Sequence, residues 1–137
     1  MNAGSPSETR LLGRQFSSGI RPGDVVALYG GLGAGKTTFV QGMLQGLGIS
    51  DNATSPSFVI MNEYPLKEKG ISLYHLDLYR LDTIDDITDI GIEDILNKNS
   101  ILVIEWAEKM GDLLPEGCVK IYFEMTGESQ REIRIEK

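Results

Sequence analysis

Apolar and polar residues follow one another along this chain in patterns that switch between strand and helix. DVVALY (residues 24–29) and ILVIE (101–105) are short apolar runs, typical of strands that are covered on both faces. TTFVQGMLQGLG (37–48) instead places its apolar residues at helical spacing and ends on glycine. The order around residue 30 is therefore predicted to be a buried strand, a glycine-rich loop and a helix.

Two pairs of segments predict hairpins. FVIMNEY (58–64) and ISLYHLDLY (71–79), separated by PLKEKG, predict an antiparallel hairpin. VKIYFEM and REIRIEK, close to the C-terminus, alternate apolar and polar residues and predict a final hairpin with one side facing water.

Two further segments carry helix signals. SPSE (5–8) resembles a capping box with proline at the first helical position, and predicts a helix that continues to about residue 18. The acidic stretch 82–96 predicts one or two short helices with a solvated face. Together the elements predict an α/β fold: a P-loop NTPase-like, three-layer α/β/α domain with a mixed parallel and antiparallel sheet.

The glycine-rich loop supplies the first candidate chemistry. Gly30, Gly35, Lys36 and Thr37 fill the spacing G-x-x-x-x-G-K-[ST]. Backbone N–H groups of such a loop, together with the N-terminus of the helix that follows, favour an anion. Lys36 is expected to face solvent in the empty site and to reach the β- and γ-phosphates of a nucleotide, while the Thr37 hydroxyl binds Mg²⁺.

Two acidic residues end predicted strands. Asp77 closes ISLYHLD, and Glu105 closes ILVIE. Ligands of open α/β sheets gather at the carboxyl ends of strands, so either acid is a candidate to hold Mg²⁺ through water or to position an attacking nucleophile. The alternative for each is a solvated residue at a strand end. His75 is interpreted as a structural residue that orders this region, and not as a proton-transfer catalyst.

Composition narrows the class of protein. The length of 137 residues suits one domain, residues 1–137, and 41% hydrophobic with 24% charged residues is ordinary for a soluble protein. No apolar run approaches the roughly 20 residues of a membrane span, and the N-terminus has no signal pattern. The single cysteine, Cys118, permits no internal disulfide, so we expect a cytoplasmic protein without a membrane association. The net charge of −7 disfavours direct binding to nucleic acid, so any link to RNA is expected to be indirect, through a partner.

Four segments carry a family resemblance. GGLGAGKTTF, SPSF (55–58), YHLDLYRL (74–81) and IEW (104–106) occur in the order and approximate spacing of the TsaE family, also called YjeE. The resemblance runs from about residue 7 to residue 134. It implies a cytoplasmic Mg²⁺-dependent ATPase that acts with TsaB and TsaD in the threonylcarbamoyladenosine modification of tRNA, with ATP hydrolysis supporting repeated turnover.

The resemblance also implies roles for individual residues. Thr37 and Glu105 would hold Mg²⁺, and Lys36, Asp77 and Glu105 would form the catalytic set. The ATP-binding residues that it implies are Gly33, Ala34, Gly35, Lys36, Thr37, Thr38, Thr9, Ser57, Trp106 and Arg131. The chain departs from the family in having Gly31 where aspartate is common and Ser57 where threonine is common. Ser57 keeps a hydroxyl, so a switch-like role of residues 55–57 remains open.

Three other functions compete with this interpretation. A small-molecule kinase shares the phosphate loop, although the six arginines form no cluster typical of a kinase lid. A GTPase is disfavoured because NKNS (97–100) has serine where the guanine-reading N-K-x-D motif needs aspartate. The third alternative is a non-catalytic module whose ATP-bound state signals to a partner.

Overall fold

The computed structural model describes residues 1–49, 61–66, 70–96 and 99–137. Its elements follow in the order β1 (Asn2–Ala3), α1 (Pro6–Ser17), β2 (Val25–Tyr29), α2 (Lys36–Gly46), β3 (Met61–Leu66), β4 (Ile71–Asp77), α3 (Ile84–Asp89), α4 (Ile92–Leu96), β5 (Ile101–Glu105), the 3₁₀ helix η1 (Ala107–Leu113), β6 (Val119–Met125) and β7 (Arg131–Glu136).

The described strands form one seven-stranded sheet in the order β1-β7-β6-β2-β5-β4-β3. Its centre is parallel, since β2 pairs with both β5 and β6, and β5 pairs with β4. Antiparallel pairs flank this centre on both sides: β3 with β4, β6 with β7, and β7 with β1. The predicted mixed sheet is thus confirmed, as are both predicted hairpins over the described residues; residues 58–60 of the first predicted hairpin lie outside them.

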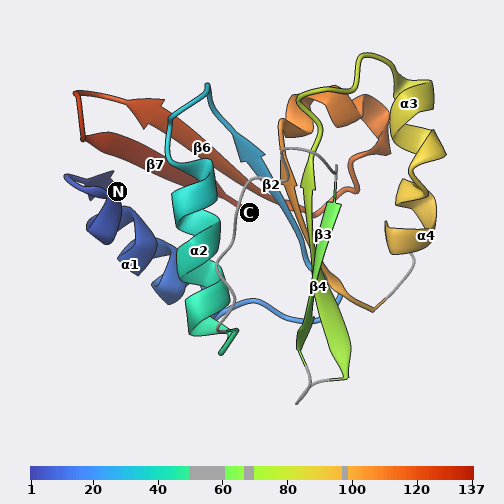
Figure 1. Ribbon diagram of the computed structural model, residues 1–137, viewed down its shortest axis with the longest axis horizontal. Coiled ribbons are helices and arrows are strands. Elements are labelled where there is room, and N and C mark those ends of the chain that lie inside the picture. The colour runs from blue at the N-terminus through green and yellow to red at the C-terminus, as the bar shows by residue number, and fades with distance from the viewer. Residues whose placement is uncertain (50–60, 67–69, 97–98) are drawn as a thin grey trace.

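Helices cover the two faces of the sheet (Figure 1), which confirms the predicted three layers. Alternate residues of each central strand point to opposite faces. On β2, Val26 and Leu28 pack with α1 and α2, whereas Ala27 belongs to the second core under α3, α4 and η1. Every residue of β5 is buried, as predicted for a strand covered on both sides.

The structure differs from the sequence prediction in several details. Pro65 lies within β3 and not in the connecting loop; β3 is an edge strand, where the missing N–H of proline is tolerated. Ser5 caps α1 by accepting from the Glu8 N–H, but the Glu8 carboxylate accepts from Gly4 and not from Ser5, so only half of the capping box forms. Strand β1 and helix η1 carry no pattern that predicted them.

Helices α1 and α2 pack unusually closely because glycines face the opposite backbone. A Cβ added at Gly42 would lie 1.9 Å from the carbonyl oxygen of Arg10, and one added at Gly13 would lie 2.1 Å from that of Phe39. The neighbours are backbone atoms and cannot move without shifting a helix. These glycines therefore set how closely α1, with its buried Thr9, approaches α2.

Among the residues that the structure describes, no helix has the length and apolar character needed to cross a membrane.

The glycine contact predicts a stability effect. Alanine is a better helix former than glycine by about 1 kcal/mol, yet Gly42→Ala forces the backbone of α1 away. We expect a net loss of unfolding free energy of about 1–3 kcal/mol, the usual cost of overpacking. Thermal denaturation measures the loss, with Gln45→Ala, at an exposed position of the same helix, as the control. A Gly42→Ala variant as stable as wild type would contradict the close packing of α1 on α2.

Candidate active site

Parallel pairing brings the acidic residues and the glycine loop to one edge of the sheet. Glu105 is in register with Leu28 on β2 and with Asp77 on β4. Leu28 lies two residues before Gly30, where the glycine loop begins. Strands β2, β4 and β5, which are distant in the sequence, therefore end at the same edge of the sheet. Ligands of open α/β sheets are found at this edge.

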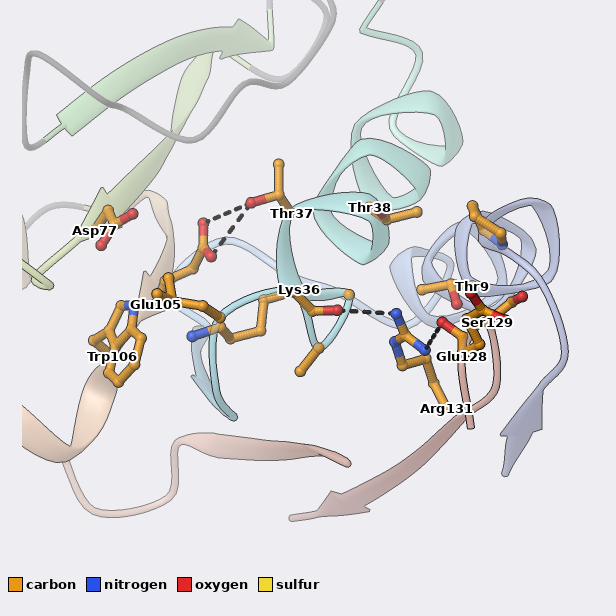
Figure 2. A pocket seen from close by; sticks show the side chains of 15 residues that line it. Thr9, Lys36, Thr37, Thr38, Asp77, Glu105, Trp106, Glu128, Ser129 and Arg131 are labelled. Carbon is orange, nitrogen blue, oxygen red and sulfur yellow. Dashed lines mark hydrogen bonds between the residues drawn. The ribbon is translucent and has the colours of Figure 1, made fainter. Parts of the chain in front are cut away.

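A cavity of about 450 Å³ opens at this edge (Figure 2). It is lined by Pro6, Thr9, Leu32, Gly33, Ala34, Gly35, Lys36, Thr37, Thr38, Asp77, Glu105, Trp106, Glu128, Ser129 and Arg131. The candidate catalytic, ATP-binding and metal-binding residues are all in this lining except Ser57, which lies outside the described residues. Gly30, the first glycine of the loop motif, is not in the lining. The sequence reasoning missed Pro6, Leu32, Glu128 and Ser129.

The glycine loop has the backbone conformation that an anion cradle needs. Gly33 and Gly35 have φ of 76° and 101°, values that strain any residue with a side chain. Gly35 is also the N-cap of α2 and has no side chain with which to cap the helix. The N-terminus of α2 thus opens into the cavity with its positive dipole end, a favourable place for phosphate.

Gly31 does not share this constraint. Its φ lies outside the left-handed region, and an added Cβ would meet nothing within 4 Å. The aspartate that the family resemblance implies at this position would fit without a steric clash. The difference at residue 31 therefore changes the charge of the loop and not its shape.

Lys36 is buried in the wall of the cavity, so the expectation that it faces solvent is wrong. The residue is 5% exposed; its Nζ donates to the Gly30 carbonyl at 2.7 Å and lies 3.9 Å from the centre of the Trp106 ring. Burial lowers the pKa of the ammonium, and the carboxylates of Glu105, Glu108 and Asp77 oppose that shift. The partners of the ammonium are thus a loop carbonyl and an aromatic face.

A sharp backbone turn at Trp106 places its ring over the Lys36 ammonium. It directly follows β5 and has φ of 59° and ψ of 42°, a left-handed conformation that costs a bulky residue about 1–3 kcal/mol. Its ring also packs against Tyr79, with ring centres 5.0 Å apart. Backbone strain of this kind is concentrated at functional sites.

Glu105 faces the start of α2. It is 3% exposed, and both of its carboxylate oxygens lie 3.4 Å from the Thr37 hydroxyl. This separation exceeds that of a typical O–H···O hydrogen bond, so the interaction between the Thr37 hydroxyl and the Glu105 carboxylate is weak. Buried His75 contacts the same carboxylate, with its Nε2 2.6 Å from Glu105 Oε2.

Thr37 and Glu105 fit the ligand preference of Mg²⁺, which takes hydroxyl, carboxylate and phosphate oxygens together with water. Among the described residues, no group of three or more His, Cys, Asp or Glu side chains is placed to hold a metal by itself. A cation at this edge would therefore take the rest of its coordination from water or from a bound phosphate.

Asp77 lines the same end of the cavity but is held differently. Its Oδ1 accepts from the Tyr79 N–H at 3.0 Å, which fixes the carboxylate at the turn that follows β4. Because Asp77 and Glu105 are side by side on neighbouring strands, the two acids lie on the same part of the cavity wall (Figure 2).

Arg131 and Thr9 line the far end of the cavity (Figure 2). The Arg131 guanidinium donates to the Gly33 carbonyl at 3.0 Å and to the Gln130 carbonyl at 2.9 Å. It therefore ties the glycine loop to the turn between β6 and β7. Thr9 is buried in α1, and its hydroxyl donates to the Ser5 carbonyl at 3.3 Å.

Comparisons of the sequence and of the fold with known proteins point to one family. The sequence model of a family described as "Threonylcarbamoyl adenosine biosynthesis protein TsaE" matches residues 3–133. The tRNA threonylcarbamoyladenosine biosynthesis protein TsaE of Bacillus subtilis (strain 168) is 36% identical over 129 residues, which cover 94% of this chain and 79% of that protein. The protein of the same name from Treponema pallidum (strain Nichols) is 37% identical over 131 residues, covering 96% and 95%. The crystal structure of Bacillus subtilis YdiB has a TM-score of 0.76 at 34% identity, over 97% of this chain and 80% of that one.

A glycine loop between a central strand and a helix, with acids at the neighbouring strand ends, defines the class of P-loop-type α/β proteins. Within that class the chain belongs to the TsaE family.

We expect that removal of the Lys36 ammonium weakens the binding of ATP. Lys36→Met keeps most of the buried stem but cannot donate to phosphate. Charge-assisted hydrogen bonds contribute about 1.5–3 kcal/mol, so ATP affinity should fall by about 10–150-fold. Calorimetric titration measures the change, with exposed Lys137→Met as the control. Wild-type ATP affinity in Lys36→Met would contradict the assignment of the loop.

Substitutions of Glu105 and Asp77 should affect different properties of the site. Glu105→Gln keeps the shape of the side chain but removes the charge that attracts a cation, so the Mg²⁺ concentration needed for half-maximal activity should rise about tenfold or more. Asp77→Asn should instead lower the hydrolysis rate at saturating Mg²⁺. Mg²⁺ titration at fixed ATP distinguishes these effects. If only Asp77→Asn shifts the Mg²⁺ dependence, the two roles are reversed.

Proposed function

We propose that this chain is a Mg²⁺-dependent ATPase that acts with TsaB and TsaD in forming N6-threonylcarbamoyladenosine on tRNA. In this proposal ATP hydrolysis supports repeated turnover of the complex. The biosynthetic role is supported by family membership and by the names of the relatives. The enzymatic part rests on one observation: a single cavity joins Lys36, Thr37, Asp77 and Glu105.

ATP would bind with its phosphates in the glycine loop and at the N-terminus of α2. Lys36 would leave the Gly30 carbonyl and donate to the β- and γ-phosphates, which offer it a stronger, charge-assisted partner. The nucleoside would extend toward the end lined by Thr9, Glu128 and Arg131. Ser57 is proposed to contribute a hydroxyl near the γ-phosphate.

Hydrolysis needs a water molecule aligned with the bond between the γ-phosphorus and its bridging oxygen. The new P–O bond forms as the bond to the bridging oxygen breaks, which yields ADP and inorganic phosphate. Asp77, fixed by the Tyr79 N–H, would orient that water. Bound Mg²⁺ would neutralise charge on the phosphates, and Thr37 with Glu105 would hold it.

The charges that line the cavity lead us to expect a slow reaction in the isolated chain. Lys36 and the loop N–H groups supply part of the positive charge that the transition state needs. Arg131 is already engaged with carbonyl oxygens, and exposed Arg80 is not in the cavity lining. An arginine finger is worth about 10³–10⁵ in rate where it is used, so a partner that supplies or orders such a charge would accelerate hydrolysis.

The acidic surface supports an indirect connection to RNA. A net charge of −7 opposes contact with a phosphate backbone. We therefore propose that tRNA is bound by the partners, in the cytoplasm, and that this chain docks onto them.

Turnover with and without the partners tests the proposal. We expect the isolated chain to bind ATP but hydrolyse it slowly, and TsaB with TsaD to raise phosphate release at least tenfold. The Lys36→Met variant, mixed with the same partners, controls for contaminating ATPases. Turnover of tens per second by the chain alone, unchanged by the partners, would contradict partner-dependent hydrolysis.

Product analysis in the same reactions separates the alternatives. A kinase would transfer the γ-phosphate to an acceptor and release less inorganic phosphate than ADP. A non-catalytic module would bind ATP and support the modification without any ADP forming. Equal amounts of ADP and phosphate, dependent on Lys36, are expected for the ATPase.

A further inference from the structure

His75 is the sole histidine of the chain and lies fully buried on β4. Its ring Nε2 is 2.6 Å from Glu105 Oε2, and its Nδ1 has no hydrogen-bond partner among the described residues. If His75 served only to fill the core, an apolar side chain would do so without leaving a buried polar atom unpaired. Leu73, two residues earlier on the same face of the strand, shows that an apolar side chain packs well there.

The chemistry of Glu105 indicates which nitrogen of the His75 ring carries the proton. An ionised carboxylate only accepts hydrogen bonds, so the nitrogen that faces Glu105 must be the donor. For an ionised Glu105, the proton of the ring is then on Nε2, and His75 donates to Oε2. The buried contact is short, as expected when the acceptor is charged.

The sheet register explains why Glu105 needs such a partner. Glu105 is directly opposite Asp77, whereas His75 is opposite Val103, one step back along the strands. Like charges opposite each other on neighbouring strands repel. The contact from Glu105 to His75 therefore runs along the diagonal, and not straight across to Asp77, and both Glu105 oxygens lie 3.4 Å from the Thr37 hydroxyl.

We propose that His75 is a positioning residue that keeps the two acids apart and fixes Glu105 for Mg²⁺ beside Thr37. This inference rests on the proposed Mg²⁺-dependent function of the same site. Hydrogen bonds to metal-binding side chains commonly set the orientation of those ligands. His75 itself touches neither the nucleotide nor the cation, and Asp77 stays free to orient water.

Two substitutions separate positioning from packing. His75→Leu fills the site without a donor, and should raise the Mg²⁺ concentration for half-maximal ATP binding by about 10–100-fold. His75→Gln keeps an N–H group and should restore most of the wild-type Mg²⁺ dependence. ATP affinity measured without Mg²⁺ should change little in either variant, because the glycine loop is intact.

Leu76→Val is the matched control. Leu76 is the next residue of β4 but points into the opposite core, so its substitution lowers stability without touching Glu105. Equal Mg²⁺ dependence in His75→Leu and wild type would overturn the proposal. So would an equal shift in His75→Leu, His75→Gln and Leu76→Val, because that pattern reports only a weakened fold.

A second measurement needs neither nucleotide nor metal. With one histidine in the chain, ¹⁵N-labelled protein gives a single set of imidazole signals, and we expect Nε2 to be protonated and its signals to move in Glu105→Gln. A ring with unprotonated Nε2 would overturn the inference even if the chain proves to be an ATPase. If wild type binds no ATP while Nε2 is protonated, the proposed function fails and the Glu105 contact stands.

Discussion

The parallel register of β2, β5 and β4 is the constraint on which the rest of the site depends. It places Leu28, Glu105 and Asp77 at one level, and the chain leaves β2 there to form the glycine loop and α2. The two apolar cores hold this register because each central strand buries both faces. A slip of one residue would turn Glu105 and Asp77 to the other face of the sheet, away from Thr37.

Charges balance one another within this frame. The Lys36 ammonium is buried against Trp106 and Gly30, close to the acids that oppose the lowering of its pKa. Glu105 is held by His75, and Arg131 by backbone carbonyls. These internal partners order the site. In the proposed function, phosphate would replace the Gly30 and Trp106 partners of Lys36, while His75 would keep Glu105 in place for the cation.

The sequence predicted those parts of the fold that local patterns encode. Apolar runs marked β2 and β5, alternation marked the hairpins, and the spacing of Gly30, Gly35 and Lys36 marked the loop. It could not predict that Lys36 is buried, because that depends on the left-handed turn at Trp106. Glu128 and Ser129 were missed for a similar reason: they reach the cavity only because the turn between β6 and β7 is tied to the glycine loop by Arg131.

Emission from Trp106, the sole tryptophan, tests most directly whether the cavity binds nucleotide by redirecting Lys36. The ammonium lies 3.9 Å from the ring centre, and its departure would change the electric field at the indole. Titration of the full chain with ATP and Mg²⁺ should give a saturable change in emission, with the same midpoint as the heat of binding. Heat of binding with unchanged emission would contradict the movement of Lys36, and the absence of both signals would contradict nucleotide binding itself.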